Sequence, residues 1–365
     1  MPDLSTTHLL ALCGFALGTI AGWVARYVRF CTFGAVEDMV LTGDLRRLKS
    51  WALAVAVAML AVQLLHVTDV ARIDETFYLS GDFHWAGALV GGLLFGLGMA
   101  FVGTCGFGTL VRMGGGDLKS FVTFLVMGLS AYMTAGGVAG YVRRYGLESV
   151  SLDLTPLGGQ GIPHVLAALL GTSAEKLWLP VALVFAGAVC AWCCSGEGLK
   201  GSRRDVISGV VIGLVVAAGF AATGILGNDP FEPAPVRSLS YVITPGRAII
   251  YLITFIGGAI DFSIALVFGT IFGSFAAAAW NREFRLEAFD DALEMRRHLL
   301  GAFLMGFGGV SAYGCTIGQG VSGMATLSLA APIALGSILI GATAGLFYLL
   351  TGSVSDAFRL ILFKR

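Results

Sequence analysis

Charged residues are scarce in this sequence. Its 365 residues include 23 Lys and Arg and 23 Asp and Glu, so that charged residues make up 13% of the chain, about half of the share that soluble domains carry. So few charged side chains cannot cover the surface of one or two water-soluble domains of this size. The mean hydropathy of +0.84 indicates a chain that lies in a lipid bilayer. A water-soluble enzyme is therefore excluded.

The sequence also lacks net charge, a basic run and paired histidines. A formal net charge of zero provides no electrostatic surface for nucleic-acid phosphates, so nucleic acid is excluded as a partner. The five histidines show no metal-ligand spacing, and tetrahedral zinc needs four suitable ligands. We therefore expect neither a metal nor another cofactor.

Long apolar runs are abundant. About 20 residues cross the hydrocarbon core as a helix, and the runs are continuous rather than alternating with period two, which argues against a barrel. They cover residues 4–25, 50–68, 83–111, 120–142, 177–196, 206–228, 248–281 and 299–355. The last two are too long for one straight helix. We expect an all-α polytopic membrane protein with about nine spans plus re-entrant half-helices, forming a single integral membrane domain over 1–365.

Two short loops carry most of the basic residues that predict orientation. Residues 44–49 contain three Lys or Arg, and residues 196–205 contain another three. Basic loops of this length favour the cytoplasmic side. Residues 69–82 carry four acidic residues against one arginine, which predicts the outer face.

Short glycine-containing motifs recur in the two halves of the chain. Residues 18–20 and 269–271 both read Gly-Thr-Ile, and the glycine-rich stretches 96–108 and 306–318 are similar. The number of residues between matching motifs differs between the two pairs, so we expect the first half to hold an extra crossing. Internal repeats are usual in secondary transporters, whose sites lie between them on broken helices. We predict a first repeat over 8–140, connecting spans over 141–245 and a second repeat over 246–355. The alternative is chance similarity between glycine-rich apolar segments.

Two cysteines lie in these glycine-rich turns. Cys105 has Gly103, Gly106 and Gly108 as neighbours, and Cys315 is flanked similarly. A helix that breaks at such glycines exposes backbone amides at the start of the next half-helix, and these amides bind anions. The turns therefore predict anion sites in which the cysteine is a weak S–H donor. The alternative is a small buried apolar side chain.

A third cysteine follows a basic segment. Cys31 lies within five residues of Arg26 and Arg29, which would attract an anion and favour the thiolate. Alternatively, the arginines only extend toward the lipid headgroups at a membrane boundary. The remaining cysteines are expected to be structural, facing lipid or other helices. They are Cys13, Cys190, Cys193 and Cys194.

Asp261 is the one acidic residue inside a long apolar run. An acid within the membrane suggests a function such as proton coupling. The position also suits a helix N-cap after Gly257 and Gly258. Both interpretations stay open at this point.

The segments around the three cysteines together resemble the YeeE/YedE sulfur-transport family. The resemblance rests on residues 29–35, 103–108 and 314–323, and residues 281–286 resemble the family's charged loop. It implies an hourglass-shaped protein with an inverted internal repeat, which passes thiosulfate or a related sulfur anion inward along three essential thiols. Neutral thiols suit this task, because weak serial sites allow both binding and release.

The function we expect is thiosulfate-type uptake by a multi-pass, non-enzymatic transporter of the cell inner membrane. Its partners would be the sulfur anion, the lipid bilayer and, as a candidate, a cytoplasmic sulfur-carrier protein. The alternatives are a membrane thiol-based sulfurtransferase or thiol–disulfide enzyme, a transporter of selenium or another sulfur species, and a scaffold protein. The expected substrate-binding residues are Cys31, Cys105, Cys315, Gly103, Gly106, Gly108, Gly314, Thr316, Gly318, Gln319 and Arg29.

Overall fold

Helices make up most of the computed structural model, which describes residues 6–195, 199, 202–228, 234–255 and 260–353. The long helices in this part are α1 (Thr6–Val28), α3 (Arg46–Val67), α4 (Trp85–Val102), α6 (Leu118–Gly136), α9 (Trp178–Cys194), α10 (Arg203–Leu226), α12 (Phe262–Trp280), α13 (Ala292–Ser311) and α14 (Ala330–Thr351). Among the described residues, eight segments are long and apolar enough to cross a membrane. They contain every long helix except α13, which begins with a charged turn. An all-α polytopic membrane protein is confirmed.

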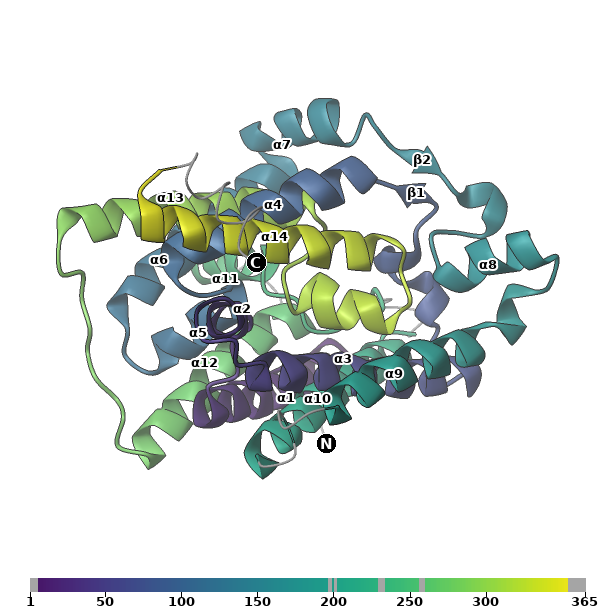
Figure 1. The fold of residues 1–365 in the computed structure, drawn as a ribbon, viewed down its shortest axis with the longest axis horizontal. Coiled ribbons are helices and arrows are strands. Elements are labelled where there is room, and N and C mark those ends of the chain that lie inside the picture. The colour runs from purple at the N-terminus through teal and green to yellow at the C-terminus, as the bar shows by residue number, and fades with distance from the viewer. Residues whose placement is uncertain (1–5, 196–198, 200–201, 229–233, 256–259, 354–365) are drawn as a thin grey trace.

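Four times along the chain, a long helix ends, the chain turns inward, a short helical segment follows, and another long helix leaves the interior. We call each such unit an inward module. The four modules are α1, α2 (Thr32–Leu41), α3; α4, α5 (Gly106–Gly114), α6; α10, α11 (Ile243–Ile253), α12; and α13, the π-helical Gly318–Gly323, α14. In Figure 1, α2 and α5 lie between a layer containing α4, α13 and α14 and a layer containing α1, α3, α10 and α12.

Three of the modules turn inward in the same way. The residue two places before each turn cysteine has a left-handed backbone: Arg29 at φ 60°, Gly103 at φ 75° and Tyr313 at φ 59°. A left-handed residue ends an α-helix, and glycine adopts that conformation without cost. Helices α1, α4 and α13 therefore stop shortly before the cysteine, and the long run 299–355 divides into two helices as expected.

Glycine allows the long helices to approach closely. Gly14, Gly18 and Gly22 of α1 lie in turn against the backbone at Phe262, Leu266 and Thr270 of α12, where a Cβ would overlap. Small residues at such contacts are typical of membrane helix pairs. Because both sets of residue numbers rise together, α1 and α12 run in the same direction.

The second and fourth modules run in opposite directions. Gly91 of α4 lies against Gly308 of α13, and Gly98 lies against Gly301, so α4 and α13 are antiparallel. Equivalent helices of an inverted repeat run in opposite directions. Helices α4 and α13 meet this requirement, whereas α1 and α12, which carry the matching Gly-Thr-Ile motifs, do not. The repeat boundaries 8–140 and 246–355 stay a prediction.

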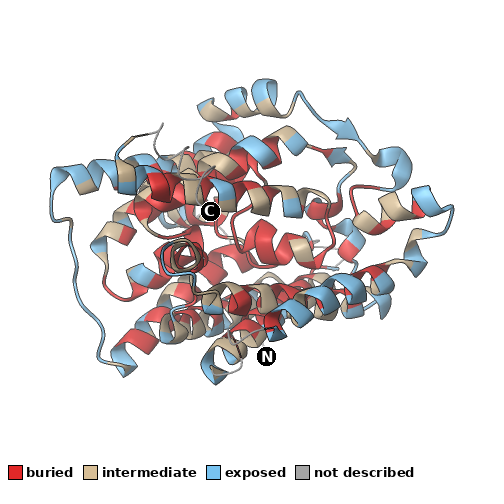
Figure 2. Cartoon of the chain, in the orientation of Figure 1, coloured by how far each residue is buried: buried red, intermediate tan, exposed pale blue. Residues whose placement is uncertain are grey.

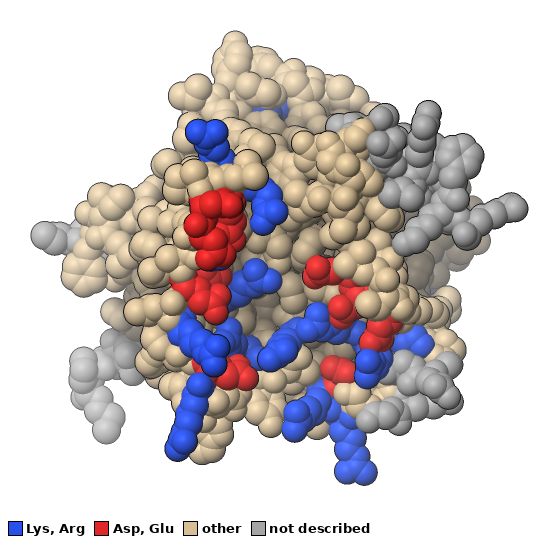
Figure 3. Space-filling model, turned by 60° about the vertical axis from the view of Figure 1, so that its left-hand side comes forward, with Lys and Arg blue, Asp and Glu red and all other residues tan. Residues whose placement is uncertain are grey.

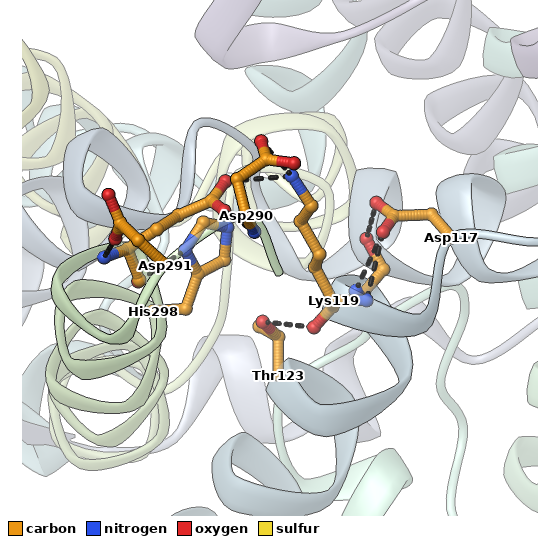
Figure 4. A network of polar contacts seen from close by, with 8 residues as sticks. Asp117, Lys119, Thr123, Asp290, Asp291 and His298 are labelled. Atoms are coloured by element: carbon orange, nitrogen blue, oxygen red, sulfur yellow. Dashed lines mark hydrogen bonds and ion pairs between the residues drawn. The ribbon is translucent and has the colours of Figure 1, made fainter. Parts of the chain in front are cut away.

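A network of polar contacts joins the first turns of α6 and α13 (Figure 4). Lys119 Nζ lies 2.9 Å from Glu294 Oε1 and 3.4 Å from Asp290 Oδ2. Asp117 caps α6 by accepting the amide of Lys119 at 2.9 Å, and Asp291 caps α13 by accepting the amide of Glu294 at 2.6 Å. Capping satisfies amides that have no partner within the helix, so both helix starts are held together at one end of the molecule.

Shorter elements lie near the other ends of the long helices. Strand β1 (Asp82–Phe83) pairs antiparallel with β2 (Leu152–Asp153), with Asp82 opposite Asp153. They are accompanied by α7 (Val138–Val142), the π-helical Arg143–Leu147 and α8 (Ile162–Leu170). The β1–β2 pair links the segment before α4 to the connection that follows α7.

Burial is concentrated where the inward modules meet, as the red central segments of Figure 2 show. The outer faces of the long helices instead expose large apolar side chains, among them Leu129, Leu183 and Phe303. A soluble monomer rarely exposes so many, and lipid would cover them here. The sequence leaves open whether the run 248–281 crosses once or folds back at Gly257 and Gly258, and these two glycines lie outside the described residues.

Candidate functional site

The Cys105 turn places a thiol at the amide end of α5. Cys105 is the N-cap of this helix, and its Sγ accepts the amide of Gly108 at 3.4 Å. Its carbonyl accepts the amide and the hydroxyl of Thr109 at 2.8 Å and 3.0 Å. A Cβ on Gly106 would overlap the carbonyl of Tyr241, so the predicted glycine permits a close approach. The Cys105 side chain is fully buried.

The Cys315 turn repeats this arrangement. Cys315 Sγ accepts the amide of Gly318 at 3.3 Å, and the Cys315 carbonyl accepts the amide of Gln319 at 2.7 Å. The Gln319 side-chain amide donates to the carbonyl of Ala312 at 3.1 Å, which ties the turn to the end of α13. Cys315, Thr316 and Gln319 are all buried.

The structure brings the three predicted cysteines into one cluster. The Cys31 thiol lies beside the Cys105 turn, with its Sγ 3.8 Å from the hydroxyl of Thr104, the residue before Cys105. Thr316, next to Cys315, lies beside the Cys105 thiol. Thr104 and Thr316 thus lie next to the Cys31 and Cys105 thiols, where three modules meet.

Tyr241 of the remaining module completes this cluster. Its backbone amide lies next to Cys315, and its ring lies near both Cys105 and Cys315. The ring packs against Phe107 with 4.9 Å between centroids, and the hydroxyl is 3.1 Å from the Thr270 hydroxyl. All four inward modules thus contribute to the buried centre.

A cavity of about 340 Å³ reaches Cys31 from one face of the protein. We call it the Arg29 cavity. Its lining includes Arg26, Arg29, Cys31, Glu37, Arg47, Gly103, Thr104, Gly108, Arg112 and Glu283. Figure 3 shows this face, where Lys and Arg side chains surround a hollow together with acidic ones. Arg112 also donates to the carbonyl of Gly103 at 2.8 Å, so it holds the chain at the break before Cys105.

A second cavity, of about 320 Å³, reaches the Cys315 turn at Gly314. We call it the Arg237 cavity. Its lining includes Phe77, Arg143, Arg237, Ser238, Ser240, Thr244, Ser263, Tyr313 and Gly314. Ser263 lies in the first turn of α12 on this side, whereas Glu283 in the Arg29 cavity follows the end of α12. At 1.5 Å per residue, this 19-residue helix spans about 28 Å, so the two cavities open on opposite faces.

Basic residues outnumber acidic ones around the Arg237 cavity. Arg237 and Arg247 lie 3.7 Å and 3.2 Å from the same carboxylate oxygen of Asp261. Arg143 pairs with Glu148 at 2.7 Å, and Glu148 also accepts the Tyr313 hydroxyl at 2.5 Å. Two arginines share one carboxylate, so one positive charge is left to attract an anion.

Asp261 caps a helix. Its Oδ1 accepts the amide of Ile264 at 2.8 Å, in the first turn of α12, while Oδ2 faces the two arginines. These contacts explain why an aspartate is found next to a membrane-spanning helix. They favour the N-cap interpretation over proton coupling.

The other cysteines lie apart from this cluster. Cys193 is buried and its Sγ donates to the carbonyl of Lys49 at 3.3 Å, between α9 and α3, while Cys194 is exposed. Within the described part of the chain, no group of three or more His, Cys, Asp or Glu could hold a metal ion.

Sequence reasoning missed several residues of the site. Arg237, Ser240 and Tyr241 lie in an extended segment with neither cysteine nor a glycine turn, so no motif marked them. Arg143 and Tyr313 are brought to the Arg237 cavity from segments far apart in the chain. One signal was present: Thr244 follows Ser240 at the spacing that separates Thr109 from Cys105.

Comparisons with known proteins agree with this architecture. Residues 28–344 match the profile of the sulphur transport family. The thiosulfate transporter TsuA of Escherichia coli (strain K12) is 29% identical over 344 residues, covering 91% of this chain and 92% of that protein. TsuA of Spirochaeta thermophila is 26% identical over 337 residues, covering 90% and 96%. The chain therefore belongs to the YeeE/YedE sulphur transport family.

Proposed function

We propose that this protein takes up thiosulfate, or a closely related sulfur-containing anion, across the cell inner membrane. The anion passes from the Arg237 cavity along Cys315, Cys105 and Cys31 into the Arg29 cavity. The names of the two relatives support the substrate class. In this proposal the protein acts as a transporter rather than an enzyme.

One observation supports the proposal: Cys31 lines one basic cavity, the Cys315 turn borders the other at Gly314, and the two cavities open on opposite faces. A dianion cannot cross hydrocarbon without donors to replace its water. Thiols and backbone amides donate hydrogen bonds without a full positive charge, so each site binds weakly enough to release the anion. Conduction needs this balance between binding and exit.

The direction of transport follows from the predicted orientation. Arg47, in the basic loop expected on the cytoplasmic side, lines the Arg29 cavity. Phe77, in the acidic segment expected outside, lines the Arg237 cavity. The Arg237 cavity is then the outer vestibule and the Arg29 cavity the inner one. A cytoplasmic sulfur-carrier protein would receive the anion at the Arg29 cavity.

The position of Cys31 beside the Cys105 turn also supports a second candidate function, in which the thiols react covalently. A sulfurtransferase or thiol–disulfide enzyme needs a resolving thiol close to the attacking one, and Cys31 Sγ lies 3.8 Å from the hydroxyl of Thr104, the residue before Cys105. Such an enzyme would form a persulfide or disulfide during turnover, which mass spectrometry detects.

Uptake of ³⁵S-labelled thiosulfate into proteoliposomes containing the purified full chain tests the proposal. We expect time-dependent accumulation of intact thiosulfate that unlabelled thiosulfate suppresses, whereas sulfate, sulfite and selenite added in parallel define the selectivity. Cys13→Ala serves as the matched cysteine control, because Cys13 lies on α1 outside both cavities. Accumulation no greater than in protein-free liposomes would contradict transport, and selective suppression by selenite would reassign the substrate.

A further inference from the structure

We propose that Ser240 is a substrate-contacting residue at the outer end of the path. It lies in the α10–α11–α12 module, on the extended segment that leads to α11, and its side chain is next to the Cys315 turn. The ligand class is an oxyanion that carries a terminal sulfur. This inference rests on the proposed function and adds to it a fourth contact that no cysteine marks.

The hydrogen bonds at the start of the short helical segments place Ser240 close to the first turn of α11. In the Cys105 module, the cysteine carbonyl accepts the hydroxyl of the threonine four residues later, Thr109, at 3.0 Å. The Ser240 carbonyl accepts the hydroxyl of Thr244, also four residues later, at 2.7 Å. Cys105 is the N-cap of α5, whereas the N-cap of α11 is Val242, two residues after Ser240. Ser240 therefore lies just before a short inward helix, as Cys105 does, but two residues further from the helix start.

The carbonyls of the other two cysteines each accept a backbone amide, as the Cys105 carbonyl does. The Cys31 carbonyl accepts the amide of Ala35 at 3.0 Å, and the Cys315 carbonyl accepts the amide of Gln319 at 2.7 Å, again four residues later. The α10–α11–α12 module differs in its approach, because α10 ends at Leu226 and a longer extended segment leads to Ser240.

The Ser240 side chain lies between the Arg237 cavity and the Cys315 turn. It lines the cavity and is half-buried, whereas Cys315 is fully buried. A Cβ on Gly318 would lie 2.8 Å from Ser240 Oγ, and Gly318 is the residue whose amide faces the Cys315 sulfur. An anion that leaves Arg237 therefore meets Ser240 before it meets Cys315.

The hydroxyl of Ser240 is free to bind a ligand. Among the described residues it has no hydrogen-bond partner, whereas the hydroxyl of the neighbouring Ser238 donates to the carbonyl of Val216 at 2.6 Å. A hydroxyl is a stronger donor than a thiol. It suits the oxygen atoms of a thiosulfate-like anion, and the terminal sulfur is then left for the Cys315 thiol.

Site-specific labelling in intact cells tests this assignment. We make Ser240→Cys in the full-length protein and add a membrane-impermeant maleimide from outside, with wild-type protein as the labelling background. We expect labelling that thiosulfate slows several-fold, because the anion occupies the same site. Ser149→Cys is the matched control: Ser149 is exposed near the Arg143–Glu148 pair and lines neither cavity, so thiosulfate should leave its labelling unchanged.

Uptake by Ser240→Ala provides the second measurement. Loss of one neutral hydrogen bond of about 1 kcal/mol predicts a roughly fivefold higher KM for thiosulfate, and Ser240→Thr, which keeps a hydroxyl, should recover part of the loss. A wild-type KM in Ser240→Ala, or thiosulfate-independent labelling of Ser240→Cys, would overturn this inference while wild-type uptake still supported the proposed function. Absence of wild-type uptake would instead contradict the proposed function itself.

Discussion

The sulfur atoms of Cys105 and Cys315 accept the same hydrogen bond, each from the backbone amide three residues further on. The donor is Gly108 at 3.4 Å in one turn and Gly318 at 3.3 Å in the other. Sulfur is a weak hydrogen-bond acceptor. An anion that replaces the sulfur as the acceptor of these amides therefore breaks only a weak hydrogen bond. In the proposed path, these amides are donors that an anion could take over at little cost.

The first prediction concerns the thiol of Cys105. Serine keeps a donor of similar size, whereas alanine removes the donor, so Cys105→Ser should retain partial thiosulfate uptake and Cys105→Ala should lose roughly fivefold or more. Initial uptake rates in proteoliposomes measure both variants. If sulfur passes through a persulfide instead, both variants fall to background, because a hydroxyl is a far poorer nucleophile than a thiolate. A persulfide on Cys105 that forms and discharges at the uptake rate would establish that route.

The second prediction concerns the left-handed backbone at Gly103. Gly103→Ala should cost about 1 kcal/mol of stability and also reduce uptake, because any shift of this residue moves Cys105 and the carbonyl that Arg112 holds. Gly43→Ala is the matched control: Gly43 has φ 73°, and a Cβ there would meet nothing within 4 Å. It should lose similar thermal stability with unchanged uptake. Equal uptake by the two variants would disprove a positioning role for Gly103.

The third prediction concerns the charge of Arg237. Arg237→Gln should raise the KM for thiosulfate by roughly tenfold, since hydrogen bonds to charged groups contribute about 1.5–3 kcal/mol. Arg247 still pairs with Asp261 in this variant, so no carboxylate is left alone. Arg144→Gln removes a charge from an exposed position that lines neither cavity and should keep the wild-type KM. The same increase in KM in both variants would indicate a general effect of surface charge rather than a binding site.

The fourth prediction separates the two roles considered for Asp261. Asparagine caps a helix as well as aspartate does. Asp261→Asn should therefore keep the hydrogen bond from the Ile264 amide and leave the pH profile of uptake unchanged. Asp261→Ala should lower the unfolding free energy by about 1 kcal/mol through loss of the cap. Uptake is measured from pH 5 to pH 8. A pH dependence present in the wild type and abolished in Asp261→Asn would restore proton coupling.

Much of the fold could be predicted because membrane helices leave local marks. Apolar runs between charged loops located α1, α3, α6, α9 and α10, since a crossing needs about 20 residues without charge. Glycine density located the breaks at Cys105 and Cys315, because glycine lowers helix stability by about 1 kcal/mol per residue. The α1–α12 motif pair was harder to interpret. The matching Gly-Thr-Ile motifs that begin at Gly18 and Gly269 reflect close helix packing at both glycines. Parallel helices need such packing as much as antiparallel helices do.

The sequence by itself determined that this chain spans a membrane, where its helices break and which three cysteines lie at the breaks. Only the tertiary structure brought Cys31, Cys105 and Cys315 together with Tyr241, and placed Arg143, Arg237 and Ser240 around one cavity. The physical reason is that helix breaks depend on local backbone preferences, which nearby residues carry. The meeting of four modules depends on long-range packing, which no single segment encodes.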